Sequence, residues 1–201
     1  MKHAALGFRA HSGWTALVGI SLEEGFPLVL LRERPRLVKT FTYEFRQPYH
    51  TAKKRLPAEA RSFISLMRAE ARQLAYRVIH SVQMDLQKQG YELKCCGLLL
   101  ASGRPLPALP QILASHALIH TADGELFREA LLHANKRCGV ETFTTKESEL
   151  LERAVEALHL QPNELGRRLV DLGHPLGSPW SQDEKFAALA AWLSLLFKVR
   201  S

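Results

Sequence analysis

The sequence predicts a three-layer α/β domain with a mixed sheet and additional C-terminal helices. Three observations favour this fold class. Short runs of apolar and β-branched residues alternate with glycine-containing turns near the N-terminus, which is typical of an antiparallel meander. A long helical pattern comes next, and a continuous apolar run follows it directly. This succession predicts a crossover helix that leads to a central strand covered on both faces.

Three short strands are expected at the start of the chain, at residues 4–9, 14–21 and 27–36. Turns at 11–13 and 23–25 separate them, and connections as short as these join antiparallel neighbours. A three-stranded meander is therefore the predicted N-terminal unit.

The longest expected element is a helix over residues 57–89. Pro57 suits the first turn of a helix because its missing N–H would be unpaired there, and Gly90 suits the C-terminal end. Ahead of this helix, apolar residues alternate with polar ones at 41–45 and predict an extended piece. Residues 47–56 are polar and basic and predict a loop.

The rest of the chain is expected to contain two strands and several helices. The central strand is predicted at 93–101 and a short strand at 140–144. A helical stretch at 111–137, with a break at Gly124, lies between them. Three helices are predicted after the strand at 140–144, and they are at 146–159, 162–172 and 182–198.

Residues 1–201 are predicted to form a single domain, because no repeat, low-complexity tract or linker interrupts them. A chain of 201 residues, of which 46% are hydrophobic, can bury a substantial core without metal or disulfide staples. Apolar residues extend around much of the helix at 182–198. We therefore expect this helix to be covered by the domain core or by a second copy of the chain.

Cysteine usage and hydropathy predict a cytoplasmic protein. The three cysteines are Cys95, Cys96 and Cys138. Cys95 and Cys96 lack the spacing of metal ligands and lie in an apolar run, so we expect them to be buried, reduced thiols. No secretory signal peptide is expected. No window reaches the roughly 18 apolar residues that a membrane span requires, so we expect no membrane association.

The net charge of +7 is concentrated in residues 1–61, which hold 11 Lys and Arg against 5 Asp and Glu. A local basic surface favours nucleic acid or another polyanion as a partner. The alternative is a surface that serves only solubility, because no aromatic-rich nucleic-acid motif accompanies it. Arg61, Arg68 and Arg72 share one stripe of the long helix, which we interpret as a solvated face.

The order of elements resembles the ribonuclease H-like fold, which includes Holliday-junction resolvases and actin-like ATPases. Two short segments carry a closer likeness to the resolvases. They read Leu6-Gly7-Phe8-Arg9-Ala10-His11-Ser12-Gly13-Trp14-Thr15 and Asp183-Glu184-Lys185-Phe186-Ala187-Ala188-Leu189-Ala190. The first resembles the resolvase opening, where a strand ends in Gly-hydrophobic-Asp, and the second is similar to their acid-led, alanine-rich final helix.

The sequence departs from this family at the residue that matters for its chemistry. Arg9 stands where the resemblance implies a metal-binding aspartate, and a guanidinium cannot ligate Mg²⁺. Ser102 and Arg104, rather than an acid, follow the predicted central strand. Two-metal nuclease chemistry needs clustered carboxylates, so we expect no Mg²⁺-dependent nuclease activity.

A second resemblance is to a bacterial protein family to which no activity is assigned. It rests on residues 7–14, 115–128 and 179–185. This likeness implies nothing about substrate or chemistry.

A group of ionisable residues in the predicted helical stretch could carry chemistry. His116, His120 and Asp123 fall at i, i+4 and i+7, on one face of a helix. Two histidines and a carboxylate could hold zinc. However, the Glu that follows the first His in metalloprotease helices is missing, and the His spacing is common by chance. We therefore predict neither a metal nor a cofactor.

The best candidate site lies beyond the carboxyl ends of the first and central strands, where open α/β sheets bind ligands. The predicted ligand-binding residues are Arg9, His11, Ser12, Ser102, Arg104, His116, His120, Glu125 and Arg128. The three arginines among these residues would each donate paired hydrogen bonds to a phosphate or a carboxylate. In the competing interpretation Arg9 pairs with Glu125, His116 only caps or packs, and no ligand binds.

Three function hypotheses follow from the sequence. The first is a non-catalytic or weakly catalytic binding module for a phosphate-bearing or nucleic-acid partner. The second is a hydrolase centred on His116 and His120. The third is a self-associating interaction protein that forms a homodimer through its C-terminal helix. Whether the chain is an enzyme is left open by the sequence.

Overall fold

Five strands form one sheet in the order β3-β2-β1-β4-β5. The computed structural model describes residues 1–101 and 103–200. β1 pairs antiparallel with β2 and parallel with β4, β2 pairs antiparallel with β3, and β4 pairs parallel with β5. This confirms the predicted mixed sheet. The strands are β1 Lys2–His11, β2 Trp14–Glu23, β3 Phe26–Glu33, β4 Tyr91–Leu100 and β5 Glu141–Lys146.

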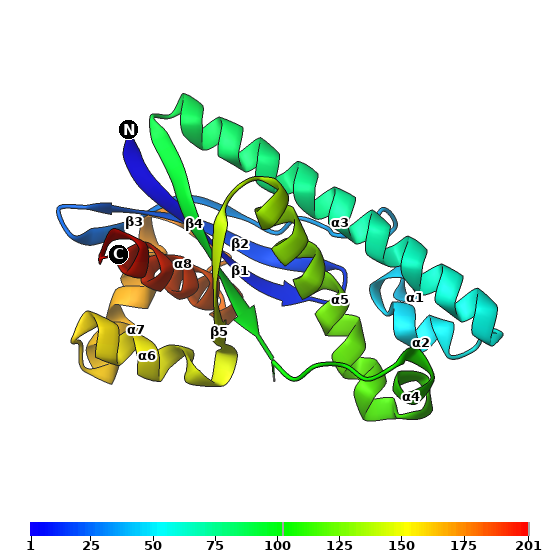
Figure 1. Ribbon diagram of the computed structural model, residues 1–201. Coiled ribbons are helices and arrows are strands. Elements are labelled where there is room, and N and C mark those ends of the chain that lie inside the picture. The colour runs from blue at the N-terminus through cyan, green and yellow to red at the C-terminus, as the bar shows by residue number, and fades with distance from the viewer. Residues whose placement is uncertain (102, 201) are drawn as a thin grey trace.

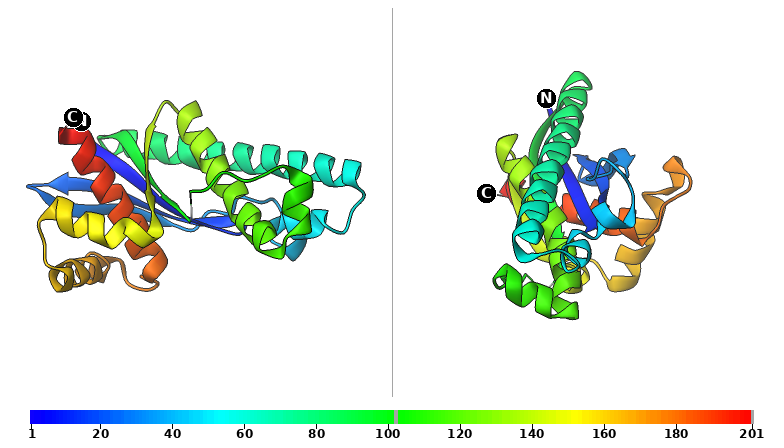
Figure 2. Two further views of the ribbon diagram at one scale, coloured as in Figure 1. Left: turned by 60° about the horizontal axis from the view of Figure 1, so that its bottom comes forward. Right: turned by 90° about the vertical axis from the view of Figure 1, so that its right-hand side faces the viewer.

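Helices cover both faces of the sheet and complete the predicted three layers. The helices are α1 Tyr43–Arg46, α2 Pro48–Ala52, α3 Pro57–Lys88, α4 Leu109–Ala114, α5 His116–Arg137, α6 Leu150–Leu158, α7 Pro162–Asp171 and α8 Gln182–Arg200. Figures 1 and 2 show α3 and α5 on one face and α8 on the other, with α6 and α7 packed beyond α8. None of the described helices is long and apolar enough to cross a membrane.

The two faces of β1 follow from the period of two in a strand. Leu6 and Phe8 are fully buried in the core shared with α3 and α5. Ala5 is buried in the second core, on the side of α8. The same alternation directs Gly7 and Arg9 to the α8 side, and this orientation decides the surroundings of Arg9.

α8 lies unusually close to the sheet because two glycines face it. A Cβ atom placed on Gly7 would lie 1.8 Å from the backbone oxygen of Ala187, and one on Gly97 would lie 2.2 Å from that of Ala190. Trp192 is only 2% exposed. The core of the domain therefore covers most of the final helix, as predicted, and dimerisation through that helix stays a prediction.

The predicted extended piece at 41–45 and most of the predicted loop at 47–56 are wrong, because residues 43–52 contain α1 and α2. Residues 53–56 form the predicted irregular connection to α3. Pro48 is the first residue of α2, where its missing N–H is tolerated. Phe41 and Phe45 pack against the larger core, and Tyr49 is buried in it. Phe41 and Phe45 therefore anchor this segment to the core, whereas Tyr43, which lies between them in the sequence, is exposed.

The predicted helix at 111–137 breaks at a different residue from the one expected. The break is at Ser115, which has extended backbone angles and separates α4 from α5. The Ser115 hydroxyl accepts a hydrogen bond from the backbone N–H of Leu118 and caps α5. Gly124 lies inside the continuous helix α5, so the predicted break there is wrong.

The N-terminal half of α3 extends beyond the sheet (Figure 1). There α1, α2, α4 and the start of α5 gather around it, and α2 contacts α3, α4 and α5. This helical end of the molecule brings side chains from three distant segments together beside the sheet.

Candidate functional site

Arg9 is held by carboxylates at the carboxyl end of β1. Its Nη2 atom lies 2.5 Å from Oε1 of Glu147, and its Nη1 atom donates to Oδ1 of Asp183 at the start of α8. The guanidinium also lies over the ring of Phe186, 5.3 Å from the centroid. The predicted pairing of Arg9 with Glu125 is therefore wrong, because strand alternation turns Arg9 toward α8.

Further side chains extend this ionic cluster. Nε2 of His11 lies 2.8 Å from Oδ1 of Asp183, and the His11 ring stacks on Trp14 at 4.3 Å. The guanidinium of Arg34 also lies over the ring of Trp14, and its Nε atom donates a hydrogen bond to Oε1 of Glu184 at 2.5 Å. The start of α8 is thus tied by ion pairs to β1 and to the segment after β3.

The carboxylate of Glu184 is fully buried within this cluster. Burial by itself would raise its pKa, but hydrogen bonds from Arg34 and Ser181 lower the pKa to about 2. Ser181 and Glu184 form a capping box at the start of the final helix, in which both the N–H and the hydroxyl of Ser181 donate to Oε2 of Glu184. The ionised carboxylate is therefore part of the folded structure.

We expect acid to destabilise the domain through Glu184. Its folded-state pKa of about 2 lies below its ordinary value of 4.5, so its contribution is complete above pH 4.5 and is lost as the pH falls toward 2. Glu184→Gln has no charge to lose. We expect this variant to be about 2 kcal/mol less stable than the parent at pH 7 and to lose less stability in acid. Urea unfolding between pH 2 and about pH 7 measures both effects.

The matched control is Glu152→Gln, which changes an exposed glutamate of α6. It should leave the pH dependence of the parent unchanged. Parallel stability curves for the parent and Glu184→Gln between pH 2 and 4.5 would contradict the assignment.

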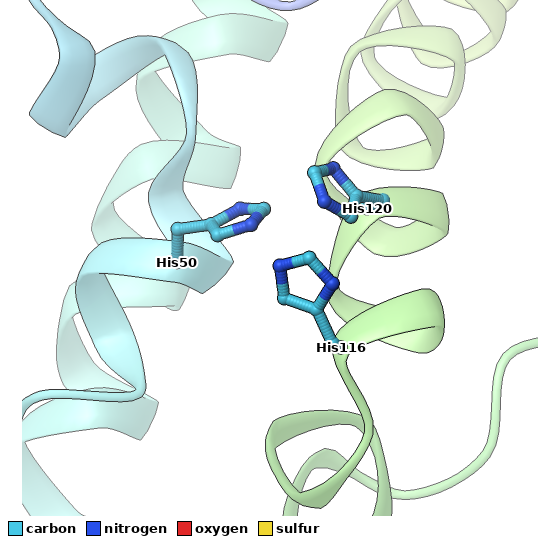
Figure 3. Close-up of side chains that lie close together, drawn as sticks. All are labelled: His50, His116 and His120. Atoms are coloured by element: carbon cyan, nitrogen blue, oxygen red, sulfur yellow. The ribbon is translucent and has the colours of Figure 1, made fainter.

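A second cluster consists of three histidines at the helical end of the molecule. His116 and His120 lie one turn apart on α5, and His50 faces them from α2 (Figure 3). One ring nitrogen of each lies within 4.8 Å of those of the other two. Nδ1 of His50 is 2.5 Å from Oδ2 of the buried Asp123, whose Oδ1 accepts the backbone N–H of Tyr49.

The surroundings of Asp123 have opposing effects on the pKa of its carboxyl group. Burial raises the pKa of Asp123 above its ordinary value, while the hydrogen bonds from His50 and the Tyr49 N–H act to lower it. The carboxylate joins α5 to α2, and it positions the imidazole of His50 toward His116 and His120.

A third feature is a pair of adjoining hollows that share Tyr49, Arg68 and Leu106. Their volumes are about 340 and 300 Å³. Four arginines and two glutamates line them, and we call them the arginine hollows. These charged residues are Arg61, Arg68, Arg72, Arg104, Glu125 and Glu129.

Both glutamates of the arginine hollows form ion pairs with arginines. Nε of Arg72 donates to Oε1 of Glu129 at 3.0 Å, and Nη1 of Arg128 lies 2.9 Å from Oε1 of Glu125. Arg68 donates a long hydrogen bond, of 3.4 Å, to the Tyr49 hydroxyl. The stripe of Arg61, Arg68 and Arg72 therefore borders a concave surface, which the interpretation as a solvated helix face did not anticipate.

The predicted ligand-binding residues fall into three groups with different partners. Arg9 and His11 belong to the ionic cluster at α8. His116 and His120 belong to the histidine cluster, and Arg104, Glu125 and Arg128 lie at or beside the arginine hollows. Ser12 is in the turn between β1 and β2, and Ser102 lies outside the described residues.

Two solved structures share this order and arrangement of elements. They are described as "T. thermophilus RuvC in complex with Holliday junction substrate", with a TM-score of 0.57, and "Thermus thermophilus RuvC structure", with a TM-score of 0.54. Each is 10% identical, and each match covers 98% of this chain and 96% of the RuvC chain. The chain has the ribonuclease H-like fold of RuvC. The prediction of a ribonuclease H-like fold is therefore confirmed.

The likeness to RuvC concerns the fold alone. No protein-family model and no curated protein sequence matches the chain. The second resemblance, to a bacterial family, therefore stays a prediction.

The residues at the carboxyl end of β1 do not fit the Mg²⁺ ion that the resemblance to resolvases implies. Mg²⁺ prefers an octahedral shell of oxygen atoms. Here the guanidinium of Arg9 stands where the resemblance implies an acid, and it binds Asp183 and Glu147, while Arg34 binds Glu184. The carboxyl end of β1 thus holds a side-chain cation bound to carboxylates.

His50 is the functional candidate that the sequence interpretation missed. The signal was present in Pro48, which favours a helix start and could have placed His50 in a helix rather than in a loop. The approach of α2 to α5 is a tertiary contact, and the spacing of residues gave no sign of it.

Proposed function

We propose that the chain is a nucleic-acid-binding module that holds a phosphate backbone and does not cleave it with Mg²⁺. The observation that carries the proposal is the set of arginines in the arginine hollows, which outnumber the glutamates there by two to one. Arginine forks match the geometry of phosphate oxygens and bind them through paired hydrogen bonds.

The basic surface continues beyond the arginine hollows. Lys53 and Lys54 are exposed just before the start of α3, near Arg61 of the arginine hollows. Because several positive side chains border one end of the molecule, an extended anion such as a nucleic acid gains more contacts than a single phosphate does. One of the RuvC structures with this fold holds a Holliday junction, and this supports the choice of partner.

The excess of basic residues in the N-terminal region overstates the charge that this region offers. Several of its basic side chains form ion pairs with acids inside the same chain. These are Lys2, Arg9, Arg34, Lys39 and Arg55. The proposal therefore rests on the arginine hollows and excludes Arg9 from the binding surface.

We expect double-stranded DNA oligonucleotides to bind with an affinity that falls steeply as salt is added. Loss of one phosphate contact lowers the slope of log K against log salt by about 0.9. Arg61→Ala and Arg104→Ala should each weaken binding and flatten this slope. Fluorescence anisotropy over a salt series measures both quantities, and the DNA should stay intact in MgCl₂.

The matched control is Arg77→Ala, which removes an exposed arginine from the same helix outside the arginine hollows. It changes the net charge equally and should retain most of the affinity. If all three variants weaken binding to the same extent, the effect is one of overall charge and the assigned surface is wrong. The assigned surface would also be wrong if Arg61→Ala and Arg104→Ala both bound DNA as tightly as the parent protein does.

A further inference from the structure

We propose that His50, His116 and His120 form a zinc site in which three imidazoles hold the ion and a fourth position stays open. The ligand nitrogens come from α2 and from one face of α5, and they lie within 4.8 Å of one another (Figure 3). Imidazole nitrogen is a common zinc ligand. The proposal is independent of nucleic-acid binding.

The orientation of His50 is the most specific feature of the site. The hydrogen bond between its Nδ1 and Oδ2 of Asp123 places the proton on Nδ1 and leaves the lone pair of Nε2 for the ion. Asp123 is itself held, because its Oδ1 accepts the N–H of Tyr49. A carboxylate that orients a metal-binding histidine from behind is the usual outer partner of a zinc ligand.

The spacing of the rings allows the ion to bind after small side-chain movements. Zn–N distances of about 2.0–2.1 Å place the nitrogens of a tetrahedral site about 3.4 Å apart. The ring centroids of His120 lie 4.4 Å from those of both His50 and His116. His116 and His120 are exposed, so their rings can rotate inward and the ion can enter from solvent.

The proposed site would have mechanical and chemical consequences. Three ligands from two helices would tie α2 to α5, so zinc should stabilise the helical end of the molecule. Three protein ligands leave one tetrahedral position for water or for an anionic ligand, which is the pattern of open zinc sites.

The test is zinc binding by tag-free protein, measured by isothermal titration calorimetry, with the bound metal counted by mass spectrometry. We expect one Zn²⁺ per chain, a rise in melting temperature on adding zinc, and no comparable binding of Mg²⁺, which prefers oxygen ligands. His116→Ala and His120→Ala should each lower zinc affinity at least about 100-fold and remove the rise in melting temperature. These two side chains are exposed, so their loss should leave the fold intact.

Two further variants distinguish the site from general histidine binding. His133→Ala removes an exposed histidine of the same helix outside the cluster and should bind zinc as the parent does. Asp123→Asn keeps an oxygen for the Tyr49 N–H but cannot accept the proton of His50, and should lower affinity about 10- to 100-fold.

The proposal is overturned if the parent binds no zinc at a one-to-one ratio, or if His120→Ala binds it as tightly as the parent. An equal loss of affinity in His133→Ala would overturn it as well. None of these outcomes depends on DNA binding, so the zinc site and the proposed function can fail separately.

Discussion

Gly7→Ala is expected to lower the free energy of unfolding by about 3 kcal/mol or more. The added methyl group would lie 1.8 Å from the backbone oxygen of Ala187 and 2.8 Å from the backbone nitrogen of Ala191. A helix backbone cannot rotate away as a flexible side chain can, so α8 must shift off the sheet. Gly97→Ala should act in the same way, because its methyl group would meet the oxygen of Ala190 at 2.2 Å. Urea unfolding measures the change.

The matched control for these variants is Gly166→Ala. Gly166 lies inside α7, and no other atom approaches within 4 Å of the position of its Cβ. Alanine has a higher helix propensity than glycine, so this variant should be as stable as the parent or more stable by up to about 1 kcal/mol. If the free energy of unfolding of Gly7→Ala stays within about 0.5 kcal/mol of the parent value, Gly7 is not required for the close contact of α8 with β1.

Arg9→Asp is expected to destabilise the domain by about 3 kcal/mol at neutral pH. The substitution removes the cation that binds Asp183 and Glu147 and adds a third carboxylate beside them. The same change supplies oxygen ligands, so Mg²⁺ should partly restore stability. At ten times its Kd the ion would contribute about 1.4 kcal/mol, or roughly 3–5 °C in Tm. Thermal unfolding with and without MgCl₂ measures the recovery.

Arg9→Met is the matched control for Arg9→Asp. It keeps an apolar stem against the ring of Phe186 but adds no acid, so it should be less sensitive to Mg²⁺ than Arg9→Asp. The parent should not respond at all in this range. If Arg9→Asp is as stable as the parent without Mg²⁺, the guanidinium does not hold these carboxylates in the folded protein.

These two experiments test one physical idea about the carboxyl edge of the sheet. α8 approaches β1 closely through Gly7, and its first turn carries Asp183 to the guanidinium of Arg9. A fold shared with RuvC is thereby closed by an internal ion pair at the position of β1 that the resemblance assigns to a metal-binding acid. The nucleic-acid-binding surface that we propose lies elsewhere, at the arginine hollows.

Local features of the sequence predicted most of the fold. Apolar periodicity and turn residues act over a few positions, and they correctly predicted the meander, the long helix α3, the buried strand β4 and the coverage of α8. The substitution of arginine for the expected aspartate at residue 9 was also visible without a structure. Where local signals competed, as at 41–56, the prediction was wrong because packing of Phe41, Phe45 and Tyr49 decided the conformation.

Contacts between distant polar side chains depend on how the helices pack. Arg9 and Asp183 are 174 residues apart, and His50 and Asp123 are 73 residues apart. No local pattern specifies such pairs. The first pair forms because α8 packs close to β1, and the second because α2 packs against α5. The histidine cluster and the arginine hollows are therefore products of helix packing around the N-terminal half of α3. Local spacing predicted that His116 and His120 share one helix face, but it gave no sign that His50 lies opposite them.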